Sequence, residues 1–258
     1  MKSLHNAAKI VINDCMGIRP GEKVVVVADT PLKKLGEIFF EAAKSAQAEA
    51  LLLVMLPRTS NGEEPPAAVA AALLETDAAL LVTSKSLSHT RARKAANNKG
   101  TRIASLPGLT EEVMARTLSS GYEAIASRCI LFAEKLSQGK EVHITTSLGT
   151  DLTFSIAGRE GAADTGLLRV PGIFGNLPAG EAYVAPVEGT AQGKLVIDGS
   201  MSAIGLISEP ILIKVGNNWR KRSGKTKPAY GKAWTKGPEY CRIGYWPKSG
   251  CNNHRSGY

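Results

Sequence analysis

The strongest constraint on the fold of this chain is the run Lys23-Val-Val-Val-Val-Ala28. A short run of β-branched residues without polar alternation predicts a strand that is buried on both faces. Asp29-Thr30-Pro31 follows at once and predicts the start of a helix, because Thr or Asp before a proline is a common beginning of a first turn. The valine run and the Asp29-Thr30-Pro31 segment after it therefore indicate the first strand and the first following helix of an α/β fold.

The same alternation of strand and helix continues to about Leu118. Further buried strands are predicted at Ala50–Leu56, Ala78–Thr83 and Arg102–Ser105, with helices between them. Repeated β-α-β units predict a parallel sheet with helices on both faces. Ligands of such sheets bind where the strands end, so the residues predicted to line that edge are Asp29, Ser84 and Ser105 to Gly108. No Gly-rich dinucleotide or phosphate-loop pattern follows any of these strands.

Residues 85–94, Lys-Ser-Leu-Ser-His-Thr-Arg-Ala-Arg-Lys, are a candidate anion or substrate contact. The hydroxyl groups of Ser88 and Thr90 would lie at a helix N-terminus, where backbone N–H groups attract anions. The alternative is a capped surface helix with three solvated basic side chains. In that alternative His89 is a structural residue.

The sequence pattern changes after Gly139. Residues 122–139 predict a helix that connects the α/β domain of residues 1–121 to a second domain. Residues 140–215 contain short segments with period-two alternation separated by turns, which predicts a β-rich α+β domain. The fold class expected is thus α/β, with an N-terminal parallel sheet followed by a β-rich domain that is incomplete at its C-terminus.

Charge is distributed unevenly along the chain. The formal net charge is +9, yet residues 1–215 contain 22 basic and 22 acidic residues. The whole excess lies in residues 216–258, so we expect no nucleic-acid contact outside this tail. The four cysteines form no C-x-x-C pair, and no secretory segment or membrane-length apolar run is visible. A cytoplasmic protein without membrane contact is expected.

The segment from Gly175 to Gly199 contains the best candidates for metal ligands. Glu181 and Glu188 lie on segments that read as strands, and Asp198 follows an apolar run. Acidic residues beside tight turns commonly build metal sites. The alternative is that they are solvated charges on edge strands.

Four motifs give the chain a family resemblance. They are GIRPGEKV at residues 17–24, SLSHTRARK at 86–94, LPGLTEE at 106–112, and NLPAGE with PVEGT between residues 176 and 190. In this order they resemble the aminopeptidase T family of cytosolic metallopeptidases over residues 5–215. The resemblance implies a two-domain protein that forms a homodimer and contains a divalent metal centre of zinc, cobalt or a similar metal. It also implies an enzyme that releases N-terminal amino acids from peptide substrates. The same superfamily contains iron-dependent dihydroxypyridine ring-cleaving dioxygenases.

The resemblance carries few functional residues over to this chain. Glu181 matches a metal ligand of the family, and Glu188 and Asp198 could support it. The family's later ligands, a further Glu, two His and an Asp, have no counterpart, since His254 is the only histidine after residue 215. A two-metal hydrolase needs several ligands. We therefore expect a truncated aminopeptidase-like chain that is inactive as written.

Two alternative functions remain open. A non-haem iron dioxygenase prefers two His and a carboxylate, and residues 140–215 offer only His143. A non-catalytic protein would use its tail, residues 216–258, which contains all three Trp and ten basic residues and is expected to be largely disordered. Aromatic residues interleaved with Lys and Arg are typical of nucleic-acid contacts. A frameshift is the other origin considered for this tail, because shifted codons of Glu239–Lys248 can encode a segment that resembles the missing ligands.

Overall fold

A computed structural model of the chain describes residues 2–118, 121–201 and 204–216. Its contacts divide the chain into two units. Unit 1 comprises Met1–Leu131 with Ala163–Ala182, and unit 2 comprises Phe132–Ala162 with Tyr183–Tyr258. The predicted tail and His254 lie outside the described residues. Within the described ranges, no helix is long and apolar enough to cross a membrane.

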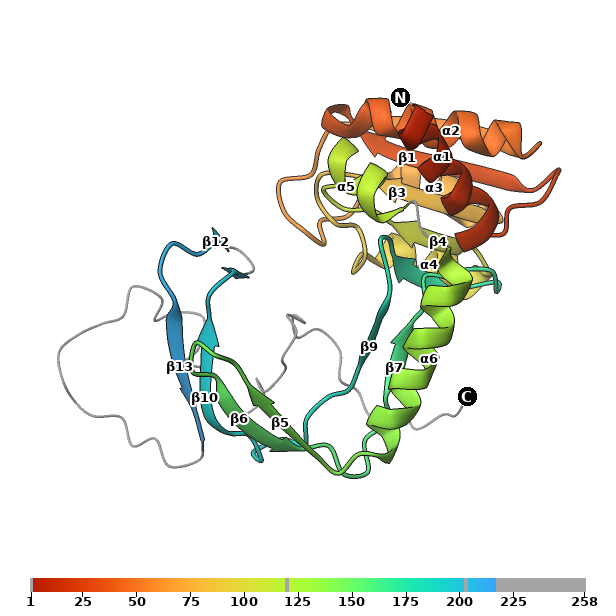
Figure 1. The fold of residues 1–258 in the computed structure, drawn as a ribbon. Helices are drawn as coiled ribbons and strands as arrows, with labels where there is room; N and C mark the ends of the chain where they lie inside the picture. Colours follow the sequence, from red (N-terminus) through yellow and green to blue (C-terminus); the bar gives the residue numbers. More distant parts are fainter. Residues whose placement is uncertain (1, 119–120, 202–203, 217–258) are drawn as a thin grey trace. The chain divides into compact units, whose positions relative to one another are not determined.

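Unit 1 is built on a five-stranded sheet in the order β2-β1-β3-β4-β8, and every neighbouring pair is parallel. Figure 1 labels β1, β3 and β4 of this sheet. The strands are β1 (Lys23–Asp29), β2 (Glu49–Met55), β3 (Ala78–Val82), β4 (Arg102–Ser105) and β8 (Phe174–Asn176). The first four confirm the strands predicted from sequence. Residues 140–215 were expected to lie wholly in the second domain, whereas β8 returns to unit 1 and completes its sheet.

Helices cover both faces of this sheet, as predicted. The helical elements of unit 1 are α1 (Lys2–Ile10), the π-type turn η1 (Val11–Cys15), the 3-10 turn η2 (Thr30–Leu32), α2 (Lys33–Ser45), α3 (Ala67–Leu74), α4 (Arg91–Lys99), α5 (Glu111–Thr117) and the first part of α6 (Tyr122–Gln138). One core cluster joins Val24 and Val26 to α1, α2 and α5, and another joins Val25 and Val27 to α3 and α4. Alternate side chains of β1 therefore enter opposite cores.

Unit 2 contains a four-stranded antiparallel sheet in the order β13-β10-β6-β5. Its strands are β5 (Glu141–Thr145), β6 (Asp151–Ser155), β10 (Gln192–Ile197) and β13 (Ile211–Val215). The buried cluster is small and consists of Leu152, Phe154, Ile156 and Ala191. Unit 2 also contains a two-stranded sheet of β11 (Ser200–Met201) and β12 (Gly205–Leu206), whereas the two-stranded sheet of β7 (Ala162–Asp164) and β9 (Glu181–Tyr183) consists mostly of unit 1 residues.

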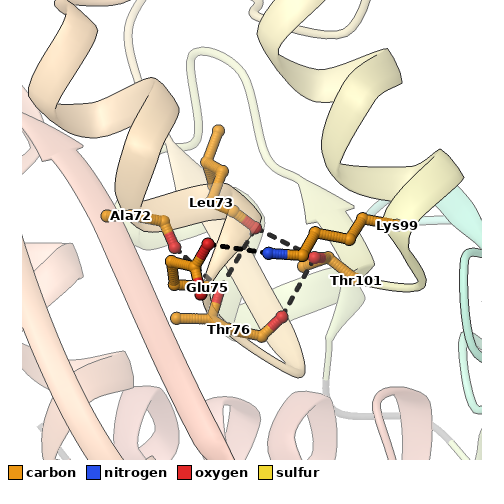
Figure 2. A network of polar contacts seen from close by, with 6 residues as sticks. All are labelled: Ala72, Leu73, Glu75, Thr76, Lys99 and Thr101. Atoms are coloured by element: carbon orange, nitrogen blue, oxygen red, sulfur yellow. Dashed lines mark hydrogen bonds and ion pairs between the residues drawn. The ribbon is translucent and has the colours of Figure 1, made fainter.

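The amino edge of the parallel sheet is fixed by a polar network (Figure 2). The Thr101 hydroxyl lies 2.9 Å from the carbonyl oxygen of Leu73 and 3.0 Å from that of Thr76. Lys99 Nζ donates to Glu75 Oε1 at 2.7 Å. These contacts join the end of α3 to the start of β4.

A buried ion pair holds the start of β4. Arg102 donates from Nη1 and Nη2 to the two carboxylate oxygens of Glu22 at 3.1 and 2.6 Å, and the Arg102 side chain is only 8% exposed. Partial burial raises the pKa of Glu22, but the hydrogen bonds from Arg102 and from the Arg19 backbone outweigh it and hold the pKa below its usual value. The folded state thus keeps Glu22 ionised and paired.

Replacing Glu22 by Ala leaves the Arg102 guanidinium buried without its counter-ion. We expect the free energy of unfolding to fall by about 3 kcal/mol, measured by urea unfolding at neutral pH. Glu75→Ala, which removes an exposed partner of Lys99, is the matched control and should leave the midpoint almost unchanged. Similar losses of unfolding free energy in the two variants would show that burial of the Arg102–Glu22 pair does not increase its contribution to stability.

Candidate functional site

Strand β1 ends at the point where the order of the sheet reverses, since β2 lies on one side of it and β3 on the other. Ligands of open parallel sheets bind at such switch points, beyond the carboxyl ends of the strands. Asp29, the last residue of β1, accepts hydrogen bonds at Oδ2 from the Ser84 backbone N–H at 2.7 Å and from the Ser84 hydroxyl at 2.5 Å. Asp29 is fully buried, and its Oδ1 has no hydrogen-bond partner among the described residues.

A second polar cluster lies at the ends of β4 and β8. The Ser88 hydroxyl is 3.0 Å from that of Ser105, receives a hydrogen bond from Ser86 at 2.9 Å and donates to Asn176 Oδ1 at 3.3 Å. Because a hydroxyl has one proton and two lone pairs, Ser88 accepts from both serines while it donates to Asn176. Register pairs Ser105 with Asn176 across the two strands. The cluster therefore depends on β8 as much as on residues 84–90.

The N-terminus of α4 already binds a carboxylate of this chain. Glu64 accepts from the backbone N–H groups of Arg91 at 2.6 Å and Ala92 at 3.2 Å. Thr90 is the N-cap residue, since its hydroxyl oxygen accepts from the Arg93 N–H at 3.2 Å. This geometry favours the capped helix over an external anion at these N–H groups.

Of the predicted contact residues, the structure places Ser88 and Thr90 in the interior and His89 at the surface. Loss of solvent, followed by the positive charges of Arg93 and Lys94, lowers the pKa of His89 below its usual value. The imidazole is therefore neutral at pH 7, and a neutral imidazole both donates and accepts hydrogen bonds.

Arg93 is half-buried, whereas the sequence suggested a solvated side chain. Its Nε donates to the Ser88 carbonyl oxygen at 2.7 Å, its Nη1 donates to Asn97 Oδ1 at 3.1 Å, and its guanidinium lies 4.2 Å above the ring of Phe174. Sequence reasoning missed this side chain and Phe174 because it did not detect β8. The spacing of Arg93 and Asn97, one helical turn apart, was the only signal available.

The three predicted metal-site acids do not belong to one unit. Glu181 lies in unit 1, whereas Glu188 and Asp198 lie in unit 2. Glu188 pairs with Arg159. Asp164, a neighbour of Glu181, has a pKa above its usual value. Burial is the main cause, the hydrogen bond from the Gly166 backbone N–H opposes it, and the negative charge of Glu181 adds to the increase.

The histidine predicted for an iron site is exposed in unit 2. His143 Nε2 lies 2.8 Å from Asp151 Oδ1, and both side chains are more than half exposed. Across residues 2–118, 121–201 and 204–216, no group of three His, Cys, Asp or Glu is close enough to hold a metal ion. Neither the Glu181 region nor the His143 pair therefore fits a complete metal site.

Comparison with known proteins identifies the family of this chain. The family model described as NicX, 2,5-dihydroxypyridine 5,6-dioxygenase, matches residues 4–218. The chain therefore belongs to the NicX family. No curated protein matches.

Two solved structures share the fold. The structure of 2,5-dihydroxypyridine dioxygenase from Pseudomonas putida KT2440 matches with a TM-score of 0.67 and 19% identity over 83% of this chain. Wild-type AmpT from Thermus thermophilus matches with a TM-score of 0.53 and 20% identity over 78% of this chain. This chain spans 65% of the length of each of them. The predicted link to the superfamily is confirmed, whereas the family is the dioxygenase one.

Replacing Glu64 by Gln removes the negative charge at the start of α4, and we expect a loss of about 0.5 to 1 kcal/mol in the free energy of unfolding at pH 7. Partial burial raises the pKa of Glu64, but the N–H groups of Arg91 and Ala92 outweigh it, so the folded pKa is lowered. The stabilisation is therefore present above the usual pKa of 4.5 and disappears as the pH falls through the folded value.

Urea unfolding of both proteins between pH 3 and pH 7 measures this difference, and the two stabilities should converge at the acid end. Glu41→Gln, in the middle of α2 and paired with exposed Lys44, is the control and should change stability little at either pH. A Glu64 effect that persists undiminished at low pH would rule out the charge as its cause.

Proposed function

We propose that this chain is a ring-opening dioxygenase of the NicX type and that it acts on a hydroxylated pyridine or a closely related ring. The observation that carries the proposal is the family match, which extends over residues 4–218 and so covers parts of both units. The fold similarity to a 2,5-dihydroxypyridine dioxygenase supports it. Because the chain spans 65% of that structure, the activity and the substrate are proposals.

A divalent metal is the cofactor proposed for this function, as it is for the aminopeptidase alternative. Iron prefers two histidines and a carboxylate, and zinc needs at least three protein ligands. The described residues do not fit such a site, since no group of three candidate ligands comes together in them. Glu181 stays a predicted metal contact on the strength of the resemblance, and we derive no catalytic step through a metal.

The residues of unit 1 support substrate binding at the carboxyl edge of the sheet. A hydroxypyridine offers hydroxyl groups and a ring nitrogen, and the exposed amide of Asn176 and the hydroxyl oxygen of Ser86 are of complementary kind. The Ser88 hydroxyl is buried and fully hydrogen-bonded, so it holds these two side chains in place. His89 is neutral at pH 7 because of its lowered pKa, so it is suited to accept a proton from a ring hydroxyl. Thr90 has a different role, because its hydroxyl donates to the Leu87 carbonyl oxygen and fixes the segment.

The aminopeptidase reading is the second candidate, and the fold similarity to AmpT favours it. Its support is weaker than that of the dioxygenase, because it rests on a lower TM-score and on no family match. Both functions use the same scaffold, so a choice between them requires a measurement of the reaction.

The purified chain should consume oxygen when it is mixed with Fe(II) and 2,5-dihydroxypyridine, followed with an oxygen electrode and by loss of ring absorbance. Zn(II) or Co(II) with leucine p-nitroanilide, followed by release of p-nitroaniline, tests the aminopeptidase. We expect activity only in the first assay. His89→Gln should lower the rate by about 10²-fold or more if His89 accepts a proton.

Asn98→Ala, an exposed and uncharged position on α4, is the matched control and should keep the full rate. Release of p-nitroaniline without oxygen uptake would replace the proposal with the peptidase. No turnover in either assay would contradict both activities for this chain and would agree either with an inactive chain that lacks metal ligands or with the non-catalytic alternative.

A further inference from the structure

Arg93 is held in one orientation by three contacts in unit 1. The Ser88 carbonyl oxygen, Asn97 and the Phe174 ring fix its Nε, its Nη1 and one face of the guanidinium. These contacts leave Nη2 and the second N–H of Nη1 without an acceptor among the described residues. A guanidinium whose conformation is already fixed loses little entropy when it binds a ligand.

This arginine also lacks an acidic partner in the part of the chain that the structure describes. Other arginines pair with carboxylates, as Arg91 does with Glu64 and Arg102 with Glu22. Arg19 and Arg128 also form no ion pair with any residue that the structure describes, but both are exposed to water. Arg93 is partly buried, and this burial lowers its pKa from its usual value. A guanidinium that loses solvent without a counter-ion is costly, and a bound anion would offset that cost.

The neighbouring groups match a flat ligand with an acidic group. Phe174 and Asn176 are two residues apart on β8, so their side chains lie on the same face of the sheet. Asn176 is exposed, and the hydrogen bond from Ser88 to its Oδ1 leaves the amide N–H groups without an acceptor in the described residues. Strand β8 is the last in the order of its sheet, so no further strand of that sheet covers it.

We propose that Arg93, Asn176 and Phe174 form a recognition site for the carboxylate of a small aromatic acid at the end of β8. The planar fork of a guanidinium matches the two oxygens of a carboxylate, and an aromatic side chain beside it favours a flat ring. The claim that the bound ring is a substrate rests on the proposed function. Under that function, the site selects a substrate that carries a carboxylate. Binding itself needs neither turnover nor a metal.

Calorimetric titration of the metal-free chain with pyridine-3-carboxylate and with pyridine-3-carboxamide tests this site. The two probes have the same shape and differ in charge, so we expect the carboxylate to bind at least about tenfold more tightly. Arg93→Met should weaken carboxylate binding by about tenfold or more, and Arg93→Lys should recover part of the loss. Arg91→Met, two residues away and already paired with Glu64, should bind like the unmodified chain.

Thermal unfolding of each variant checks that the fold is kept. If Arg93→Met does not fold, Asn176→Ala provides the second variant and should weaken binding of the carboxylate severalfold. Equal binding of acid and amide, equal losses in Arg91→Met and Arg93→Met, or no saturable binding of the acid would overturn the proposal. The outcome is separate from ring cleavage, because oxygen uptake without any preference for carboxylates refutes only this site.

Discussion

The burial of β1 on both faces is the constraint on which the rest of unit 1 depends. Val24 to Val27 are fully buried, and they alternate between the two helix layers. A buried valine contributes about 1.5 to 3 kcal/mol, whereas an exposed ion pair contributes about 1 kcal/mol or less. The apolar strand therefore decides the arrangement of the layers. Asp29 ends this strand at the switch point, so the same constraint also fixes the position of the candidate site.

Most of the parallel sheet could be predicted from sequence because its strands are local, apolar and separated by helices. Strand β8 could not, since Phe174-Gly175-Asn176 has neither length nor alternation. A Cβ at Gly175 would lie 2.7 Å from the Cδ2 atom of Leu168, so any larger residue there would require the end of the Leu168 side chain to move. Because β8 was not predicted, the contact of Arg93 with Phe174 on that strand was not predicted either. The sequence shows the residue types at a site, whereas pairing between residues about 80 apart depends on the tertiary fold.

The metal ligands show the limit of a resemblance. Glu181 was predicted to be a metal ligand from a motif, and this stays a prediction: the structure gives it an acidic neighbour, Asp164, and no group of three candidate ligands comes together among the described residues. Metal binding needs several donors in one geometry, which no single motif specifies. The polar edge of unit 1, by contrast, is supported by several independent hydrogen bonds. Family membership and the edge of the sheet therefore carry the functional argument together.

The return of residues 163–182 to unit 1 has a consequence for the order in which the protein folds. During synthesis the first four strands leave the ribosome well before β8, because the residues of unit 2 between Phe132 and Ala162 come first. Until β8 arrives, β4 is an open edge, and open edges of apolar sheets associate with other chains. The end of the sheet that would bind a ligand is thus the last part of that sheet to be completed, and until then β4 is open to wrong pairing at the place where the site will form.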